Sequence, residues 1–153
     1  MPDVVDAATC SQMMSGIRGK NTKPEMLLRR GLYARGLRYR LHVKDLPGSP
    51  DLVVPAGKAV LFAHGCFWQG HDCHLFRMPG SRPDFWRTKI KRNREVDRCT
   101  VEALREAGWR VGAVWECALK GRTRLYLNVV LDVCAAWTRE GGNMLEIRGE
   151  TNE

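Results

Sequence analysis

Residues 50–64 read PDLVVPAGKAVLFAH, and this stretch indicates the class of fold. It holds two short apolar runs, at 51–54 and 58–63, separated by the turn residues of positions 55–57. A similar run at 39–43 precedes them. Short apolar runs punctuated by proline and glycine are typical of strands joined by tight connections. We therefore expect three strands in this part of the chain.

Helical patterns flank these strands in the sequence. Thr22-Lys-Pro-Glu25 is a capping box ahead of an apolar run, so a helix is expected over about 23–35, ending at Gly36. Further along we expect a loop at 64–83, a helix over about 84–107 ending at Gly108, a strand at 110–116 and a helix over about 123–137. This order predicts an α/β or α+β domain. We adopt α/β, with a mixed central sheet flanked by helices in a single domain.

The two ends of the chain differ from this middle part. Residues 9–17 are expected to form a short helix that presents Met14 and Ile17 on one side. The polar, glycine-containing tail after Glu140 is expected to be poorly ordered. We therefore divide the chain into an N-terminal arm at 1–22, a folded domain at 23–139 and a flexible tail at 140–153.

Composition argues against a membrane protein and favours a polyanionic partner. The 153 residues carry 25 Lys and Arg against 17 Asp and Glu, a net charge of +8, and no apolar run is long enough to span a bilayer. The N-terminal region shows no basic-then-apolar signal segment, so we expect the cytoplasm. Because that compartment is reducing, the six cysteines are expected to be metal ligands or thiols, not three disulfides.

A cluster of metal-binding side chains lies in the predicted loop. Three such side chains fall within eight residues: Cys66, His71 and Cys73. This density suits tetrahedral zinc but leaves the fourth ligand open. Cys117 is the best candidate, because it follows a predicted strand as Cys66 does; Asp72 and His74 are further possible ligands. The remaining cysteines are expected to be ordinary thiols: Cys10, Cys99 and Cys134.

A second candidate site lies where the two central strands begin and end. Pro50-Asp51 enters one strand and Phe62-Ala63-His64 ends the next. Many metal-dependent nucleases place an acidic residue and a lysine on the second strand, but neither is present here. The Asp51 carboxylate, the Ala63 carbonyl and the His64 imidazole could still hold hydrated magnesium and transfer a proton. The alternative is ordinary turn chemistry at Pro-Asp.

Aromatic and basic residues suggest contact with nucleic acid. Phe67 and Trp68 lie on the cysteine-rich loop and Trp86 opens the long helix, where they could act as rigid wedges between base steps. Residues 82–98 hold seven basic and three acidic side chains. At helical spacing, Lys89 and Asn93 share a sector with Trp86 and could reach base edges, while the adjacent stripe fits phosphates: Arg87, Lys91, Arg94 and Arg98. Packing against the sheet and a solvated helix face are the alternatives.

Taken together, these residues resemble the very short patch repair (Vsr) mismatch endonuclease family, from Met14 to Trp137. The matching motifs are Met14-x-x-Ile17, Thr22-x-x-Glu25, Leu46-Pro-Gly-x-Pro-Asp51, His64-Gly-Cys-Phe-Trp68, His71-x-Cys73, Phe85-Trp86, Lys89 and Asn93, Asp97-Arg98, Gly108-Trp-Arg-Val111 and Trp115-Glu-Cys-Ala118. The resemblance implies a restriction-endonuclease-like nuclease core, a structural zinc and magnesium-dependent nicking. It implies cleavage 5′ of the thymine in T:G mismatches left by deamination of 5-methylcytosine.

The resemblance also implies a role for each matching residue. Asp51 and the main-chain carbonyl of Ala63 would bind magnesium, with His64 and Asp97 around the hydrated ion. The zinc ligands would be Cys66, His71, Cys73 and Cys117. The DNA contacts would be Met14, Ile17, Phe67, Trp68, Trp86, Lys89 and Asn93. For Glu25, an active-site role competes with helix capping, and we expect capping to be at least part of its function. Double-stranded DNA with a T:G mismatch is the expected partner of a monomer, and mismatch-repair proteins are implied by the family only.

One departure from the family pattern affects the expected activity. Position 69, where the family usually has a histidine that activates water, is Gln69. A neutral amide can hydrogen-bond water but cannot accept its proton. Either His64 or a phosphate oxygen replaces it, or the chain nicks slowly, or it is a zinc-braced mismatch-binding protein with an impaired catalytic centre. A nuclease of the same fold that acts on another lesion is a third hypothesis.

Overall fold

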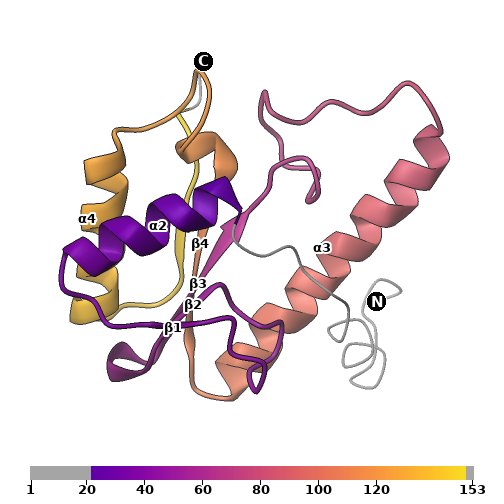
Figure 1. The fold of residues 1–153 in the computed structure, drawn as a ribbon. Coiled ribbons are helices and arrows are strands. Elements are labelled where there is room, and N and C mark those ends of the chain that lie inside the picture. The colour runs from indigo at the N-terminus through magenta and orange to yellow at the C-terminus, as the bar shows by residue number, and fades with distance from the viewer. Residues whose placement is uncertain (1–21, 151–153) are drawn as a thin grey trace.

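A mixed five-stranded sheet lies at the centre of the molecule (Figure 1). A computed structural model describes residues 22–150 of the chain. The strands follow the order β1-β2-β3-β4-β5 across the sheet, and their bounds are β1 Arg40–Leu41, β2 Leu52–Val54, β3 Ala59–His64, β4 Arg110–Trp115 and β5 Leu145–Ile147. The first three pair antiparallel, and β3, β4 and β5 pair parallel. The predicted mixed sheet and α/β class are confirmed.

Helices cover both faces of this sheet. Helices α2 (Lys23–Ala34) and α4 (Leu127–Glu140) lie together on one side of the strands, and the long helix α3 (Pro83–Glu106) lies on the other (Figure 1). Because both faces are covered, the strands need apolar side chains on both sides. This explains why β2 and β3 read as nearly continuous apolar runs, and all three residues of β2 are buried.

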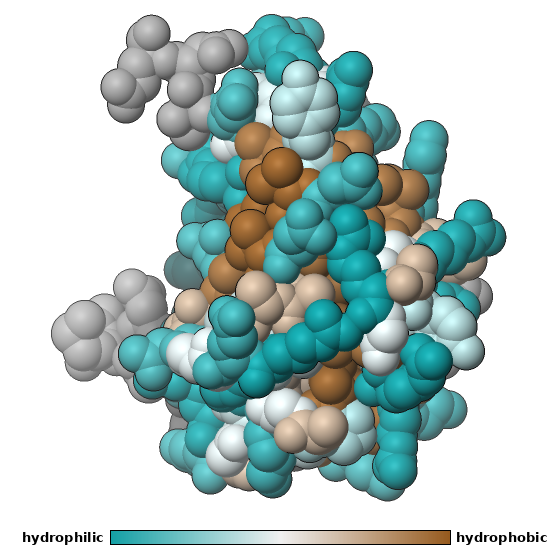
Figure 2. Space-filling view, turned by 90° about the vertical axis from the view of Figure 1, so that its left-hand side faces the viewer, coloured by the Kyte–Doolittle hydropathy of each residue, from teal (hydrophilic) through white to brown (hydrophobic). Residues whose placement is uncertain are grey.

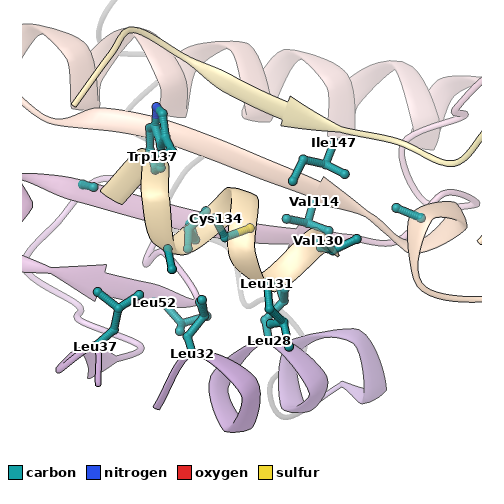
Figure 3. Close-up of a cluster of buried hydrophobic side chains, with 14 residues drawn as sticks. Leu28, Leu32, Leu37, Leu52, Val114, Val130, Leu131, Cys134, Trp137 and Ile147 are labelled. Atoms are coloured by element: carbon teal, nitrogen blue, oxygen red, sulfur yellow. The ribbon is translucent and has the colours of Figure 1, made fainter. Parts of the chain in front are cut away.

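The larger core fills the space between α2, α4 and one face of the sheet (Figure 3). Leu28 and Leu32, one helical turn apart on α2, meet Leu131 of α4 and Leu52 of β2. A smaller core on the opposite face joins Val60 and Phe62 of β3 to the long helix α3 through Leu104. The alternation of side chains along β3 therefore divides its residues between two cores.

The helix and strand boundaries follow the expected signals closely. Thr22 is the N-cap of α2 and accepts the backbone N–H of Glu25 at 3.4 Å. Gly36 and Gly108 follow α2 and α3 with φ of +87° and +90°, a conformation that favours glycine. Short 3₁₀ turns follow β2 and β4, at Pro55–Gly57 and Glu116–Ala118.

Two expectations are corrected at the C-terminal end, and others lie outside the described residues. The last helix begins at Leu127, not near residue 123, and continues to Glu140. The tail is not wholly unstructured, because residues 145–147 form β5 and bury Ile147 against the larger core. Only three residues pair there, too few to give a periodic sequence signal. The expected helix at 9–17, Cys10, Met14 and Ile17 lie outside the described residues.

Part of the α4 surface is apolar and exposed. Figure 2 shows a band of hydrophobic residues on the side of the molecule that carries α4. Leu127, Val129 and Val133 of this helix are exposed, and Tyr126 before it is 85% exposed.

Within residues 22–150, no helix is both long and apolar enough to cross a membrane.

Candidate metal centres and active site

Four side chains from two parts of the chain, the loop after β3 and the turn after β4, converge on one potential metal centre. Their ligand atoms all lie within 4.8 Å of one another: Cys66, His71, Cys73 and Cys117. The sulfur of Cys117 lies 3.7 Å from Nδ1 of His71. Three thiols and one imidazole form a complete tetrahedral donor set of the kind that soft and borderline ions prefer. This group, which we call the Cys₃His cluster, could hold a metal ion.

Backbone hydrogen bonds to sulfur favour the thiolate form of two of these cysteines. The N–H of Cys117 donates to Sγ of Cys66, and the N–H of Gly149 donates to Sγ of Cys117, each at 3.3 Å. Burial opposes ionisation and raises the pKa of both thiols above the ordinary value. Burial also lowers the pKa of His71, which keeps its imidazole neutral and able to coordinate a cation. The cluster therefore combines a desolvated pocket with donors that favour bound thiolates.

The sheet explains why these residues meet. β3 and β4 are parallel neighbours, and His64 pairs in register with Trp115 at their ends. As the sequence predicted, Cys66 and Cys117 each follow one of these strands, and the separation is two residues in both cases. Asp72 and His74 do not join the cluster: Asp72 accepts a hydrogen bond from Arg148 at 2.8 Å, and His74 lies 3.4 Å from Thr123.

The cysteines outside this cluster differ from one another. Cys134 is a buried free thiol in the larger core, as expected. Cys99 of α3 forms a disulfide, so the expectation of an ordinary thiol is wrong at that position. A disulfide requires that the fold bring two Cα atoms within reach of each other, and this approach is not visible in local sequence.

A second group of potential metal ligands lies beside the start of β2. Glu25, His42 and Asp51 place one ligand atom each within 4.8 Å of the others. Glu25 is fully buried, Asp51 is 4% exposed, and Nε2 of His42 lies 2.7 Å from Oε2 of Glu25. A buried carboxylate is costly unless it has partners, and Arg29 also contacts Glu25 at 3.3 Å. We call these three residues the Glu–His–Asp cluster.

The expected metal-binding and proton-transfer residues lie near one another in two pairs. The backbone N–H of Ala63 donates to Oδ2 of Asp51 at 2.7 Å, which ties the carboxylate to the end of β3. Nε2 of His64 lies 3.3 Å from Oδ1 of Asp97 on α3. His64 is 4% exposed, so this contact holds its ring at the buried end of the strand.

Glu25 does more than cap its helix. The cap uses its backbone N–H, which donates to Thr22, whereas its carboxylate contacts Arg29 and His42. Both side-chain contacts use Oε2. The carboxylate of Glu25 lies in the cluster that contains Asp51, and its active-site role stays a prediction.

The candidate wedge residues form one group of rings. Phe67 lies edge-on to Trp68 and to Trp86, with centroid distances of 5.3 Å in both cases. Trp68 and Trp86 are 5.9 Å apart. Trp68 is 50% exposed and Phe85, next to Trp86, is 43% exposed. The loop after β3 and the start of α3 thus present large aromatic side chains to solvent while packing them against each other.

The long helix holds this loop through backbone carbonyls. Nδ2 of Asn93 donates to the carbonyl of Trp68, and Nε of Arg94 donates to the carbonyl of Gln69, each at 2.8 Å. Arg94 also donates to the carbonyl of Gly70. Lys89 is exposed. Asn93 and Arg94 therefore already brace the loop, in addition to any DNA contact they make.

The basic stripe of α3 is partly neutralised within the protein. Arg98 contacts Glu95 at 3.0 Å and Glu102 at 2.9 Å, and Arg87 contacts Asp84 at 3.1 Å. These pairs lie on one helix and are exposed or half-buried, so solvent screens them and each stabilises the helix only weakly. The stripe thus offers fewer unpaired cations to phosphates than its sequence suggests.

Sequence reasoning missed His42 and the packing of Trp115. The Trp115 ring stacks on His71 at 3.9 Å and lies 4.9 Å from His64, between the Cys₃His cluster and the expected proton-transfer residue. The approach of His42 to Asp51 depends on strand pairing. Leu41, the last residue of β1, pairs with Leu52, the first residue of β2, so His42 after β1 lies near Asp51 before β2.

Comparison of the sequence with known proteins identifies its relatives. A family model described as "DNA mismatch endonuclease Vsr" matches residues 2–75. The type II nicking enzyme V.XorIIP of Xanthomonas oryzae is 48% identical over 122 residues, which is 78% of this chain and 90% of the relative. The DNA mismatch endonuclease Vsr of Escherichia coli is 44% identical over 137 residues, 90% of this chain and 88% of the relative.

A third relative shows the same extent of similarity. The type II nicking enzyme V.NmeAIP of Neisseria meningitidis is 43% identical over 122 residues, covering 80% of this chain and 87% of the relative. Vsr family proteins are DNA endonucleases with a restriction-endonuclease-like fold. Because the identity extends over most of this chain and most of each relative, the match is not confined to one motif. The chain therefore belongs to the Vsr family of DNA mismatch endonucleases.

Proposed function

We propose that this protein is a magnesium-dependent endonuclease that nicks double-stranded DNA 5′ of the thymine in T:G mismatches. The observation that supports this most directly is the buried Asp51 carboxylate, which is held by the N–H of Ala63 in the Glu–His–Asp cluster. Oxygen donors suit magnesium, so Asp51 and the main-chain carbonyl of Ala63 would hold it. When bound, magnesium would polarise the scissile phosphate and stabilise negative charge.

The protein's own residues would orient the attacking water and transfer its proton. His64 is buried and lies 3.3 Å from Asp97, so its ring is held in one orientation. Gln69 supplies an amide that can hydrogen-bond water but accepts no proton. We therefore assign proton transfer to His64, positioned by Asp97.

Zinc would be structural in this proposal. The Cys₃His cluster supplies four protein ligands, which leaves no open position for water or substrate. Bound zinc would join the aromatic loop to the ends of β3 and β4. Phe67, Trp68 and Trp86 would then act as a rigid wedge, and a mismatch would admit it more easily because its stacking and pairing are weaker.

Other contacts of the proposal rest on the family resemblance. Met14 and Ile17 would contact the opposite groove, and Lys89 and Asn93 would reach the mismatched bases. Mismatch-repair proteins as partners, a monomeric state and a cytoplasmic location also stay predictions.

A nicking assay tests the proposal. Zinc-loaded protein is incubated with an end-labelled duplex containing one T:G pair, with magnesium or with chelator, beside a duplex that has a T:A pair at the same position. We expect one magnesium-dependent nick on the 5′ side of the mismatched thymine. Equal nicking of both duplexes, or nicking of the T:G duplex in chelator, would contradict the proposal.

The competing hypothesis is a mismatch-binding protein whose catalytic centre is impaired at position 69. It predicts tight binding of the T:G duplex without a nick. Gln69→His distinguishes the two, because a general base typically contributes about 10²–10⁴-fold in rate. Recovery of nicking only in the Gln69→His protein would support the binding-protein hypothesis for the natural chain.

A further inference from the structure

The geometry around His42 bears on which cation the proposed active site binds. His42 follows β1, and its side chain is 17% exposed beside the fully buried Glu25. Its Nε2 lies 2.7 Å from Oε2 of Glu25, and one of its ring nitrogens lies within 4.8 Å of a carboxylate oxygen of Asp51. An imidazole therefore lies beside both carboxylates of the Glu–His–Asp cluster.

The spacing of the three donor atoms suits a single octahedral ion. With metal–ligand bonds of about 2.1 Å, donors at neighbouring positions lie about 3 Å apart and donors at opposite positions about 4.2 Å apart. The 2.7 Å separation between His42 and Glu25 is close to that of neighbouring donors, and no two donor atoms of the cluster lie more than 4.8 Å apart. The three donor atoms are therefore close enough together for one ion to contact all of them.

We propose that His42 supplies a nitrogen ligand to the cation held by Asp51, so that the site binds Mn²⁺ more tightly than Mg²⁺. The proposal rests on the proposed function, since it concerns the same cation site. Mg²⁺ prefers oxygen donors and dehydrates reluctantly, whereas first-row divalent ions gain more from an imidazole. Mn²⁺ also accepts carboxylates, so it matches a site with two carboxylates and one imidazole.

A purely structural role for His42 predicts something different. If the imidazole only orients Glu25 through their hydrogen bond, its removal should weaken Mn²⁺ and Mg²⁺ binding to the same degree. If it is a ligand, its removal should weaken Mn²⁺ binding selectively. The Mn²⁺-to-Mg²⁺ preference therefore distinguishes a ligand from a positioning residue.

The backbone of His42 determines which variants are suitable. Its φ is +48°, in the left-handed region that asparagine and glycine tolerate better than other residues. His42→Asn replaces the imidazole with an amide oxygen donor, and His42→Gly removes the donor altogether. His74→Asn is the matched control, because His74 lies outside both clusters and contacts Thr123.

The experiment measures metal binding by zinc-loaded protein without DNA. Free Mn²⁺ is followed by electron paramagnetic resonance, Mg²⁺ affinity is obtained by competition, and pulsed measurements detect ¹⁴N bonded to Mn²⁺. We expect one Mn²⁺ per chain with a directly bonded ¹⁴N in the parent and in His74→Asn. His42→Asn and His42→Gly should lose this signal and at least about tenfold in Mn²⁺ affinity, with less than about threefold change for Mg²⁺.

Three results would overturn the proposal: no Mn²⁺ binding by the parent, no ¹⁴N signal in it, or unchanged Mn²⁺ affinity in both His42 variants. An equal loss of both ions would also overturn it, in favour of the orienting role. Zinc content and far-ultraviolet circular dichroism show that each variant is folded. The binding experiment contains no DNA, so its result does not depend on nicking. If Mn²⁺ binds with a ¹⁴N ligand but the nicking assay is negative, only the proposed function is rejected.

Discussion

Cys66 and Cys117 lie 51 residues apart in the sequence and are joined by a hydrogen bond from the Cys117 N–H to the Cys66 sulfur. The donor–acceptor distance is 3.3 Å. The contact exists because β3 and β4 are parallel neighbours whose ends lie at one edge of the sheet. The site that we assign to zinc is thus tied to the central sheet. Loss of the metal should therefore destabilise both the loop after β3 and the core beside it.

Cys117→Ser should lower zinc content from about one ion per chain to well below half. A serine hydroxyl at this position cannot supply the thiolate that completes the tetrahedral set. Metal analysis after gel filtration measures this directly. Cys134→Ser is the matched control, because Cys134 is equally buried but lies in the larger core, outside the cluster. Full zinc retention by Cys117→Ser would show that the fourth ligand is assigned wrongly.

Asp51→Asn should reduce nicking of the T:G duplex by at least about 100-fold, because the site loses a charged oxygen ligand. The asparagine side-chain oxygen can still accept the N–H of Ala63, so folding and DNA binding should be preserved. Single-turnover nicking and a mobility-shift assay measure the two effects separately. Asp45→Asn provides an exposed aspartate outside both clusters for comparison. Normal nicking by Asp51→Asn would remove this residue from the magnesium site.

Trp68→Ala should weaken binding of the T:G duplex by about 5- to 150-fold, since stacking on one aromatic ring contributes about 1–3 kcal/mol. Binding of a fully matched duplex should change less, because a wedge gains most where stacking is already weak. Titration of fluorescent duplexes measures both affinities. Tyr126→Ala is the control, because this ring is 85% exposed and precedes α4, outside the group of candidate wedge rings. Equal losses for both duplexes would argue against a wedge.

Cys134 should resist alkylation in the native protein. Burial raises the pKa of its thiol from 9.0 to about 12, so almost no thiolate forms at pH 8. Because the folded state holds this proton more tightly, its contribution to stability is complete below pH 9.0 and is lost as the pH rises toward about 12. Mass spectrometry after iodoacetamide treatment should find Cys134 unmodified in native protein and modified in guanidinium. Rapid native labelling would show that this part of the core opens readily.

Local signals predicted most elements of the fold but not every boundary. The capping box at Thr22 and the glycines at 36 and 108 each act within a few residues, so the corresponding helix ends follow the sequence. The start of α4 differs, because Tyr126 offers no capping side chain to mark it. β5 was missed, since only its pairing with β4 makes residues 145–147 a strand.

The residues of the candidate sites also differ in whether the sequence could identify them. Cys66, His71 and Cys73 could be recognised because they fall within eight residues, and Cys117 because it follows a strand. His42 was not recognised, because its approach to Asp51 depends on the antiparallel pairing of β1 with β2, which brings the end of one strand beside the start of the other. The cations of α3 looked available from their spacing, but Arg94 and Arg98 make contacts within the protein that spacing cannot reveal.

By itself the sequence determined the α/β class, the family and the members of the Cys₃His cluster, because these follow from the order of the elements and from motifs that are read along the chain. The tertiary structure alone decided that His42 joins Glu25 and Asp51 and that Trp115 lies between His64 and His71. The physical reason is strand pairing: hydrogen bonds between strands fix which residues face each other across a sheet, and a shift of one residue would separate these groups.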